Sequence, residues 1–164
     1  MRKPVSLPAA AAFTGAALSL LACPASTFAQ SNALQQRLEN ATRIECSFGV
    51  IATGTWEDAG PTVSVEAAEL TAAFFDIDVG GGTAEAEGPY GNSFIVVRYA
   101  EGYLHFMQMA HAGPLHLTTV LAQESTDGRM KAVHTRHEYS PTVLPGFTSR
   151  PEMYVGDCAV SSGE

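Results

Sequence analysis

The stretch that decides the fold is SFIVVRYAEGYLHFMQMAHAGPLHLTTVLAQESTDGRMKAVHTRHEY, residues Ser93 to Tyr139. Short runs rich in Val, Leu, Thr and aromatic residues alternate there with Gly, Pro and Asp turn signals, which is the pattern of consecutive β-strands. We expect strands near Ser93–Tyr99, Tyr103–Met109, Pro114–Ala122 and Arg129–Tyr139. All five histidines of the chain lie in this stretch. The sequence therefore predicts a meander of four strands that carries every imidazole.

Further strands are expected on both sides of the meander, together with one short amphipathic helix. The stretch 62–78 is ambiguous, because its alanines favour a helix while its alternating apolar residues favour a strand; we predict a strand because both neighbours read as β. The expected helix is Ser31–Ala41, and the expected strands are Arg43–Trp56, Thr62–Asp78, Thr83–Glu87 and Met153–Val160.

Seven or eight short strands with no long helix between them predict an all-β fold, a single small antiparallel meander barrel or sandwich. The strand rhythm resembles that of lipocalin-like and avidin-like barrels. No motif of those families is present, so the resemblance implies an architecture and no function.

Two cysteines lie near opposite ends of the expected domain, Cys46 in its first strand and Cys158 in its last. An even pair of cysteines in an exported protein is most simply a disulfide, with two separate buried thiols as the alternative. The predicted bridge would tie the first strand to the last, as a closed meander requires.

The N-terminus has the features of an export signal, predicted as residues 1–29. Arg2 and Lys3 precede an apolar run, and Thr27-Phe28-Ala29 offers small residues for cleavage before Gln30. A competing interpretation is a lipobox ending at Cys23, which would anchor the protein through a lipid. After cleavage we expect an N-terminal segment over 30–42, an all-β domain over 43–160, a frayed tail over 161–164, and no transmembrane segment. The protein would be periplasmic or secreted.

The charge balance argues against nucleic acid as a partner. The whole chain has a formal net charge of −8, and removing Arg2 and Lys3 with the signal leaves seven basic residues against 17 acidic ones, or −10. Binding to phosphate backbones depends on clustered Lys and Arg, and no such cluster is present. The remaining partner classes are a small molecule or another protein.

Hairpin geometry places most of the candidate site residues on one face of the meander. A three-residue loop at 100–102 pairs Val97 with His105, and a four-residue loop at 110–113 pairs Met107 with His116. The opposite face, with Phe94, Val96, Leu104 and Phe106, is expected to be the core. The first face would line a binding cavity, with these candidate ligand-binding residues: Tyr99, Tyr103, His105, Met107, His116 and His134.

The same face suggests a metal site as an alternative function. Imidazole and thioether groups suit copper, and imidazole suits zinc, so His105, Met107 and His116 are candidate ligands, with His134 or His137 as a further one. Residues three apart on a strand point to opposite faces, so His134 and His137 are not expected to bind one ion together.

A second metal-binding alternative is a partial calcium-loop pattern. It runs from Asp76 to Glu87, but it lacks a side-chain ligand at Gly80, and a glycine-rich hairpin turn is the simpler interpretation.

No catalytic motif is present, neither Gly-x-Ser-x-Gly, nor His-Glu-x-x-His, nor a phosphate loop. A hydrolase or isomerase using His105 or His134 is the second alternative. The expectation that we carry forward is a non-enzymatic exported β-domain that binds a small apolar or amphipathic ligand or a surface partner, with no cofactor identified.

Overall fold

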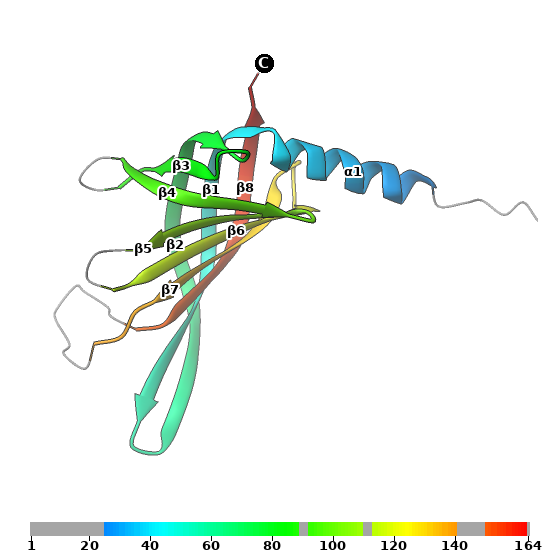
Figure 1. Ribbon diagram of the computed structural model, residues 1–164. Helices are drawn as coiled ribbons and strands as arrows, with labels where there is room; N and C mark the ends of the chain where they lie inside the picture. Colours follow the sequence, from blue (N-terminus) through cyan, green and yellow to red (C-terminus); the bar gives the residue numbers. More distant parts are fainter. Residues whose placement is uncertain (1–24, 89–91, 110–112, 141–149, 164) are drawn as a thin grey trace, which may run out of the picture.

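The computed structural model describes residues 25–88, 92–109, 113–140 and 150–163. One antiparallel sheet of eight strands, in sequence order, closes into a barrel by pairing the last strand with the first (Figure 1). The elements are α1 (Ala25–Glu39), β1 (Ala41–Glu57), β2 (Gly60–Asp78), β3 (Thr83–Ala86), β4 (Ser93–Ala100), β5 (Tyr103–Met109), β6 (Leu115–Glu124), β7 (Met130–His137) and β8 (Glu152–Ser162). The predicted all-β class is confirmed, as a barrel.

The predicted disulfide is confirmed, and it lies where the barrel closes. Cys46 on β1 and Cys158 on β8 are direct partners across the two strands, with a Cα–Cα distance of 3.9 Å. The bridge joins residues 112 positions apart. It therefore holds the first and last strands together at the one seam that chain connectivity does not secure.

The register of the meander differs from the prediction at both hairpins around β5. Ala100 pairs with Tyr103 across a two-residue turn, and Met109 pairs with Leu115. Both pairings are one residue away from the predicted ones, and a one-residue shift moves every side chain of a strand to the other face. The prediction that placed His105 and Met107 on the same face as His116 was therefore wrong.

The inward face consequently differs from the predicted core face. Leu104 and Phe106 do face inward, as predicted, but Phe94 and Val96 face outward and are exposed. The buried side chains of β4 to β6 are Ile95, Val97, Leu104, Phe106, Thr118 and Val120.

One end of the barrel is closed by α1, which leans against the ends of β5, β6 and β8 (Figure 1). Leu38 is fully buried in the core. Arg37 donates to the backbone carbonyl oxygens of Gly128 and Val160, at 3.0 and 2.9 Å. The helix thereby satisfies carbonyls at the strand ends that it covers.

Several predicted boundaries shift. The helix begins at Ala25 and ends at Glu39, earlier than predicted at both ends, and β8 extends to Ser162, so the predicted frayed tail is shorter. The predicted cleavage point before Gln30 falls within α1. Residues 1–24 and most of the predicted loop 141–151 lie outside the described residues. Within the described part of the chain, no helix has the length and apolar character needed to cross a bilayer.

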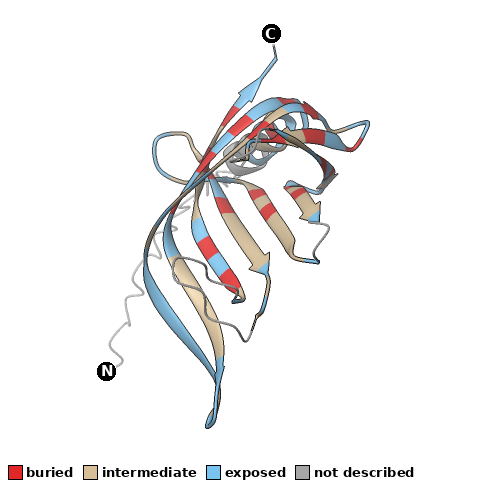
Figure 2. Cartoon of the chain, turned by 90° about the vertical axis from the view of Figure 1, so that its left-hand side faces the viewer, coloured by how far each residue is buried: buried red, intermediate tan, exposed pale blue. Residues whose placement is uncertain are grey.

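The β1–β2 hairpin is much longer than the rest of the sheet and projects beyond it (Figure 1). A bulge between Phe48 and Val50 interrupts the pairing of β1 with both β2 and β8. Figure 2 shows that buried residues are concentrated in the barrel, whereas the end of the hairpin is intermediate or exposed.

Candidate functional site

A cavity of about 360 Å³ opens inside the barrel at the end away from α1. Its lining combines two kinds of wall. Apolar side chains come from β2 to β5, namely Leu70, Ala72, Phe74, Ala86, Ile95 and Phe106. Polar side chains come from β5 to β7, namely Gln108, His116, Thr118, His134 and Arg136. The cavity is therefore amphipathic across its width.

A larger hollow of about 540 Å³ lies over β1, β2 and the end of β3. Its described lining includes Glu45, Ser47, Thr71 and Glu87, and no histidine or arginine. We take the smaller cavity as the candidate site, because it is the one where titratable and hydrogen-bonding side chains converge.

His134 is at the centre of the polar wall. Strand alternation turns Ala132, His134 and Arg136 of β7 inward together. The hydroxyl of Thr118 and Nδ1 of His134 are 2.8 Å apart, and the His134 ring lies 5.8 Å from the ring of Tyr154. Burial, and to a lesser extent the neighbouring His116 and Arg136, lower the pKa of His134 to about 4. The imidazole is therefore neutral at pH 7.

His116 lies beside His134, with the two rings edge to face and their centroids 6.0 Å apart. Burial, and then the positive charge of Arg136, lower the pKa of His116 as well. The structure gives the His116 ring no hydrogen bond to a described residue, and the ring lines the cavity. Its nitrogens are therefore available to a ligand.

Arg136 is held by two carboxylates at the rim of the cavity. Its guanidinium lies 3.1 Å from Glu152 and 3.3 Å from Glu138. Glu152 is 5% exposed, and it also accepts a hydrogen bond of 2.7 Å from the hydroxyl of Tyr154. Burial and the neighbouring Glu152 raise the pKa of Tyr154. The polar wall is thus a connected network of charged and neutral groups.

The six predicted site residues separate into three places. His116 and His134 meet in the cavity, as the sequence suggested. Tyr99 faces inward but at the α1 end, where its hydroxyl lies 3.5 Å from the carbonyl oxygen of Gln35. His105 is on the outer face, with Nδ1 2.9 Å from the hydroxyl of Thr119.

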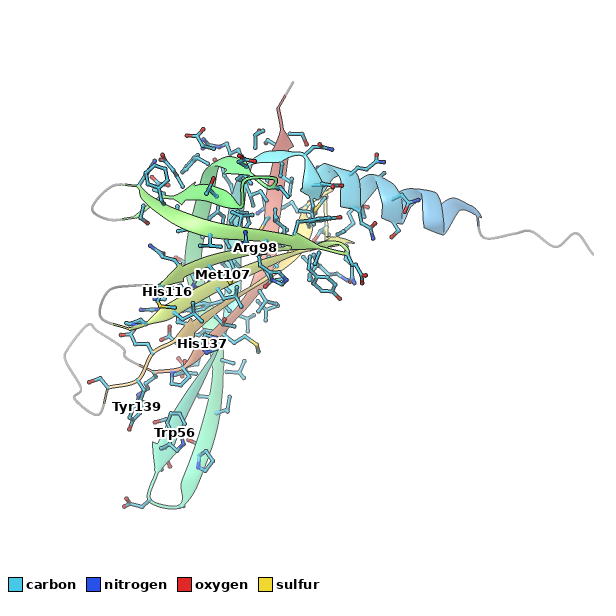
Figure 3. All side chains as sticks on the ribbon, in the orientation of Figure 1. Trp56, Arg98, Met107, His116, His137 and Tyr139 are labelled. Carbon is cyan, nitrogen blue, oxygen red and sulfur yellow. A yellow bond between two sulfur atoms is a disulfide. The ribbon has the colours of Figure 1, made fainter. Side chains whose placement is uncertain are left out.

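The other two members of the predicted site are also on the outer face. Tyr103 is exposed and stacks on His105, with ring centroids 6.2 Å apart. Met107 follows His105 on the same face of β5. Figure 3 marks Met107 and His116 on neighbouring strands, and the register shows that their side chains leave the sheet in opposite directions.

The arrangement does not provide the shared face on which the copper or zinc alternative depended. His105 and Met107 point out of the barrel, whereas His116 points in. Among the described residues, no group of three or more His, Cys, Asp or Glu side chains is placed to hold a metal ion. His134 and His137 lie on opposite faces of β7, as expected, with His137 exposed near the hydroxyl of Thr135.

The partial calcium-loop pattern forms the turn between β2 and β3. Oδ1 of Asp78 accepts a hydrogen bond of 2.7 Å from the backbone N–H of Gly81, and Gly82 has the left-handed φ of 72°. The carboxylate of Asp78 thus stabilises the turn itself.

Five residues of the site and its network were not among the predicted site residues: Gln108, Thr118 and Arg136 in the cavity lining, and Glu152 and Tyr154 beside it. Arg136 could have been found by alternation, because it is two residues after His134 on the same strand. Glu152 and Tyr154 could have been found from the disulfide, because alternation from an inward Cys158 turns Tyr154 and Glu152 inward as well.

Comparison with known proteins gives no relative from which a role could be transferred. No protein-family model, curated protein or solved structure matches this chain. The residues of the cavity are therefore the basis on which a function can be proposed.

Proposed function

We propose that the barrel binds a small amphipathic molecule with an uncharged polar end. The single observation that carries the proposal is the cavity whose apolar wall, including Phe74 and Phe106, faces the imidazoles of His116 and His134. Its volume, about 360 Å³, falls at the lower end of the range of about 300 to 1,000 Å³ for small-molecule sites. The apolar body of the ligand would lie against the aromatic wall, and its polar end would hydrogen-bond to imidazole.

The charges at the rim favour a ligand without a negative charge. The guanidinium of Arg136 is matched against two carboxylates, Glu138 and Glu152, and both cavity imidazoles are neutral at pH 7. Glu87 adds a third carboxylate to the lining, so no cation is left uncompensated for an anionic head group. A buried anion without a partner is costly. Alcohols, ketones and phenols therefore fit this end better than carboxylic acids.

A hydrolase or isomerase receives weaker support from the same residues. The distance between the Thr118 hydroxyl and His134 Nδ1 suits a nucleophile and its base. However, Thr118 is only 2% exposed, and none of the described hydrogen bonds joins a carboxylate to the His134 ring. Ligand binding alone requires neither an accessible hydroxyl nor a carboxylate partner for the imidazole.

The binding proposal is tested by filling the cavity. Replacing Ala72 with leucine adds volume at the apolar wall, whereas Ala159→Leu adds the same volume on the outer side of β8. We expect 1-decanol to displace an environment-sensitive apolar dye from the wild type and from A159L. The affinity of 1-decanol for A72L should be at least about tenfold lower, a change that corresponds to about 1.4 kcal/mol. Equal affinity in all three proteins would contradict the proposal.

The character of the polar end is tested with three ligands of equal chain length. Decanol, decanoate and decylamine present neutral, anionic and cationic heads on the same tail. At pH 7 we expect decanol to bind more tightly than decanoate or decylamine. Tighter binding of either charged ligand would keep the cavity as a ligand site but refute the uncharged head group.

We also propose that the protein works outside the cytoplasm. The Cys46–Cys158 bridge supports this, because structural disulfides persist in oxidising compartments. Mass spectrometry of the mature protein is expected to find Gln30 as the first residue. A diacylated Cys23 would instead establish a membrane-anchored lipoprotein, and an intact N-terminus with free thiols would contradict export.

A further inference from the structure

The β1–β2 hairpin extends beyond the strands that support it. The last pairing of β1 with β8 joins Thr53 to Glu152, yet β1 and β2 stay paired to Glu57 and Gly60 (Figure 1). Near the tip, the ring of Trp56 lies 5.1 Å from that of Tyr139 (Figure 3). A long two-stranded projection is marginally stable alone, so its apolar surface requires an explanation.

The outer face of this hairpin is apolar over three adjacent strands. In one row across the sheet, Val50 lies between Ala67 and Val155; in the next, Ala52 lies between Val65 and Met153. Further rows toward the tip pair Gly54 with Val63 and Trp56 with Pro61. We call this face the hairpin patch; its exposed members are Val50, Trp56, Pro61, Val63, Val65, Ala67, Met153 and Val155.

The centre of the hairpin patch is highly exposed. Val63 is 71% exposed and Val65 is 67% exposed, and Trp56 is 58% exposed. Scattered apolar residues are normal on a protein surface, but a contiguous apolar patch marks an interaction site.

One edge of β2 beside the hairpin patch has no partner strand among the described residues, and we call it the open edge. The described pairs of β2 with β3 run only from Phe74 to Asp78, with one further bond from the Glu87 N–H to the Ala73 carbonyl oxygen. Between Gly60 and Ala72, no described strand pairs with that edge. An open edge can add an extended peptide as a further strand, through main-chain hydrogen bonds.

The charge of the hairpin selects among possible occupants of this edge. It carries Glu57, Asp58, Glu66 and Glu69, and the sequence from Ile44 to Val97 contains no Lys or Arg. A second copy of the chain would bring the same four carboxylates to the interface, within a protein of net charge −8. A basic partner instead gains from complementary charge.

A hollow at the bulge supports the same assignment. About 480 Å³ in volume, it lies along the edge and is lined by Ser47, Phe48, Gly49, Ala68, Glu69, Leu70 and Thr71. Ala68 and Leu70 of this lining lie on the same face of β2 as Glu66, so the methylene stem of a basic side chain there can lie against them.

We propose that the open edge of β2 and the hairpin patch dock an extended segment of a partner protein in which apolar and basic side chains alternate. Strand alternation places the apolar side chains of such a segment beside Val63 and Val65, and its basic ones beside Glu66 on the other face. This inference is independent of the ligand in the barrel.

Trp56 provides a direct reporter, because it is the only tryptophan of the chain and belongs to the hairpin patch. The probe is a seven-residue peptide of alternating lysine and valine, compared with one of alternating glutamate and valine. We expect the lysine peptide to shift the Trp56 emission to the blue in a saturable way. We expect at least a fivefold loss of affinity at high salt, because exposed charge pairs are screened.

Variants separate the hairpin from the rest of the barrel surface. The double variant Val63→Lys, Val65→Lys should lose at least about tenfold in peptide affinity. The matched variant Val96→Lys, at an exposed outer position of β4, should retain it. Retained affinity in the double variant, or equal binding of the glutamate peptide, would overturn the proposal. A blue shift that grows with protein concentration alone would overturn it in favour of self-association.

Discussion

On β6 and β7, the two ends of the barrel carry opposite kinds of inward side chain. Along β7, Met130 and Ala132 are buried at the α1 end, whereas His134 and Arg136 follow at the cavity end. On β6, Val120 likewise lies at the α1 end and His116 at the cavity end. The inward face of both strands thus changes from apolar to polar along its length.

The α1 end stabilises the fold, whereas the cavity end carries the polar groups of the candidate site. The α1 end gains free energy from burying apolar side chains, such as Leu38 and Leu104, which are fully buried. The cavity end buries Glu152 and the His134 ring, which is favourable only because hydrogen bonds and ion pairs satisfy them. Apolar residues could fill the same space at a lower cost in free energy. Polar residues buried in spite of that cost are typical of functional sites.

The largest effect should come from opening the barrel seam. Replacing both Cys46 and Cys158 with alanine frees a loop of 112 residues and should lower the free energy of unfolding by about 2 to 5 kcal/mol. Urea denaturation followed by far-UV circular dichroism measures the loss. A change below about 1 kcal/mol would show that strand pairing alone secures the seam.

The next test removes the helix contact at the apolar end. Leu38→Ala should cost about 2 to 5 kcal/mol, because Leu38 is fully buried in the core. Gln36→Ala, at an exposed position of the same helix, is the matched control and should change stability by about 0.5 kcal/mol or less. Equal effects of the two variants would mean that α1 does not contribute to the core.

The cavity end should respond to pH where the apolar end does not. The pKa of His134 is about 4 in the folded protein, against the ordinary value of 6.5 that we take for the unfolded chain. The unfolded chain therefore binds more protons between these two pH values. Stability should be independent of this group above pH 6.5 and fall as the pH drops toward 4. The total loss is up to about 3 kcal/mol at 1.36 kcal/mol per pKa unit.

Two variants of β7 isolate this contribution. His134→Gln should flatten the stability profile between pH 7 and pH 5, whereas His137→Gln, at an exposed position three residues later, should leave it unchanged. Denaturation midpoints across the pH series provide the measurement. A profile that is unaltered by His134→Gln would assign the pH dependence to other groups.

The smallest effect on the free energy of unfolding is expected from removing a threonine hydroxyl. Two threonine–histidine pairs of nearly equal length, on opposite faces of the sheet, allow the comparison. Thr118→Val removes the partner of His134 inside the barrel and should cost about 1 to 3 kcal/mol, because a buried group is left unsatisfied. Thr119→Val removes the partner of His105 on the outer face, where water can replace it, and should cost about 0.5 kcal/mol or less. Equal costs would show that the cavity end is as hydrated as the surface.

The strands could be predicted from the sequence, but which side chains of β5 point into the barrel could not. The turn at Glu101-Gly102 places both residues at positive φ, 47° and 85°. A non-glycine residue rarely adopts that conformation, so the single glycine indicated a three-residue loop instead. The register of the second hairpin also differs by one residue from the predicted register. The two errors cancelled across β5, which is why His116 was correctly grouped with Val97 while His105 was not.

The network around Glu152 was missed for a different reason. Glu152 and Tyr154 lie directly opposite Arg136 and His134 across the β7–β8 pair. The stretch 138–151 joins these two strands, and it is too long to set their register as a tight hairpin turn does. The remaining signal was the expected bridge at Cys158, because alternation from it leads to Tyr154 and Glu152.

The most direct test of the ligand site compares inner and outer histidine rings in one experiment. Proton–nitrogen NMR spectra of the imidazoles are recorded while 1-decanol is added at pH 7. The account predicts that the ring signals of His116 and His134 shift in a saturable way, while those of His105 and His137 stay constant. Shifts confined to His105 or His137, or saturable binding that leaves both inner rings unchanged, would contradict a ligand site at the polar end of the barrel.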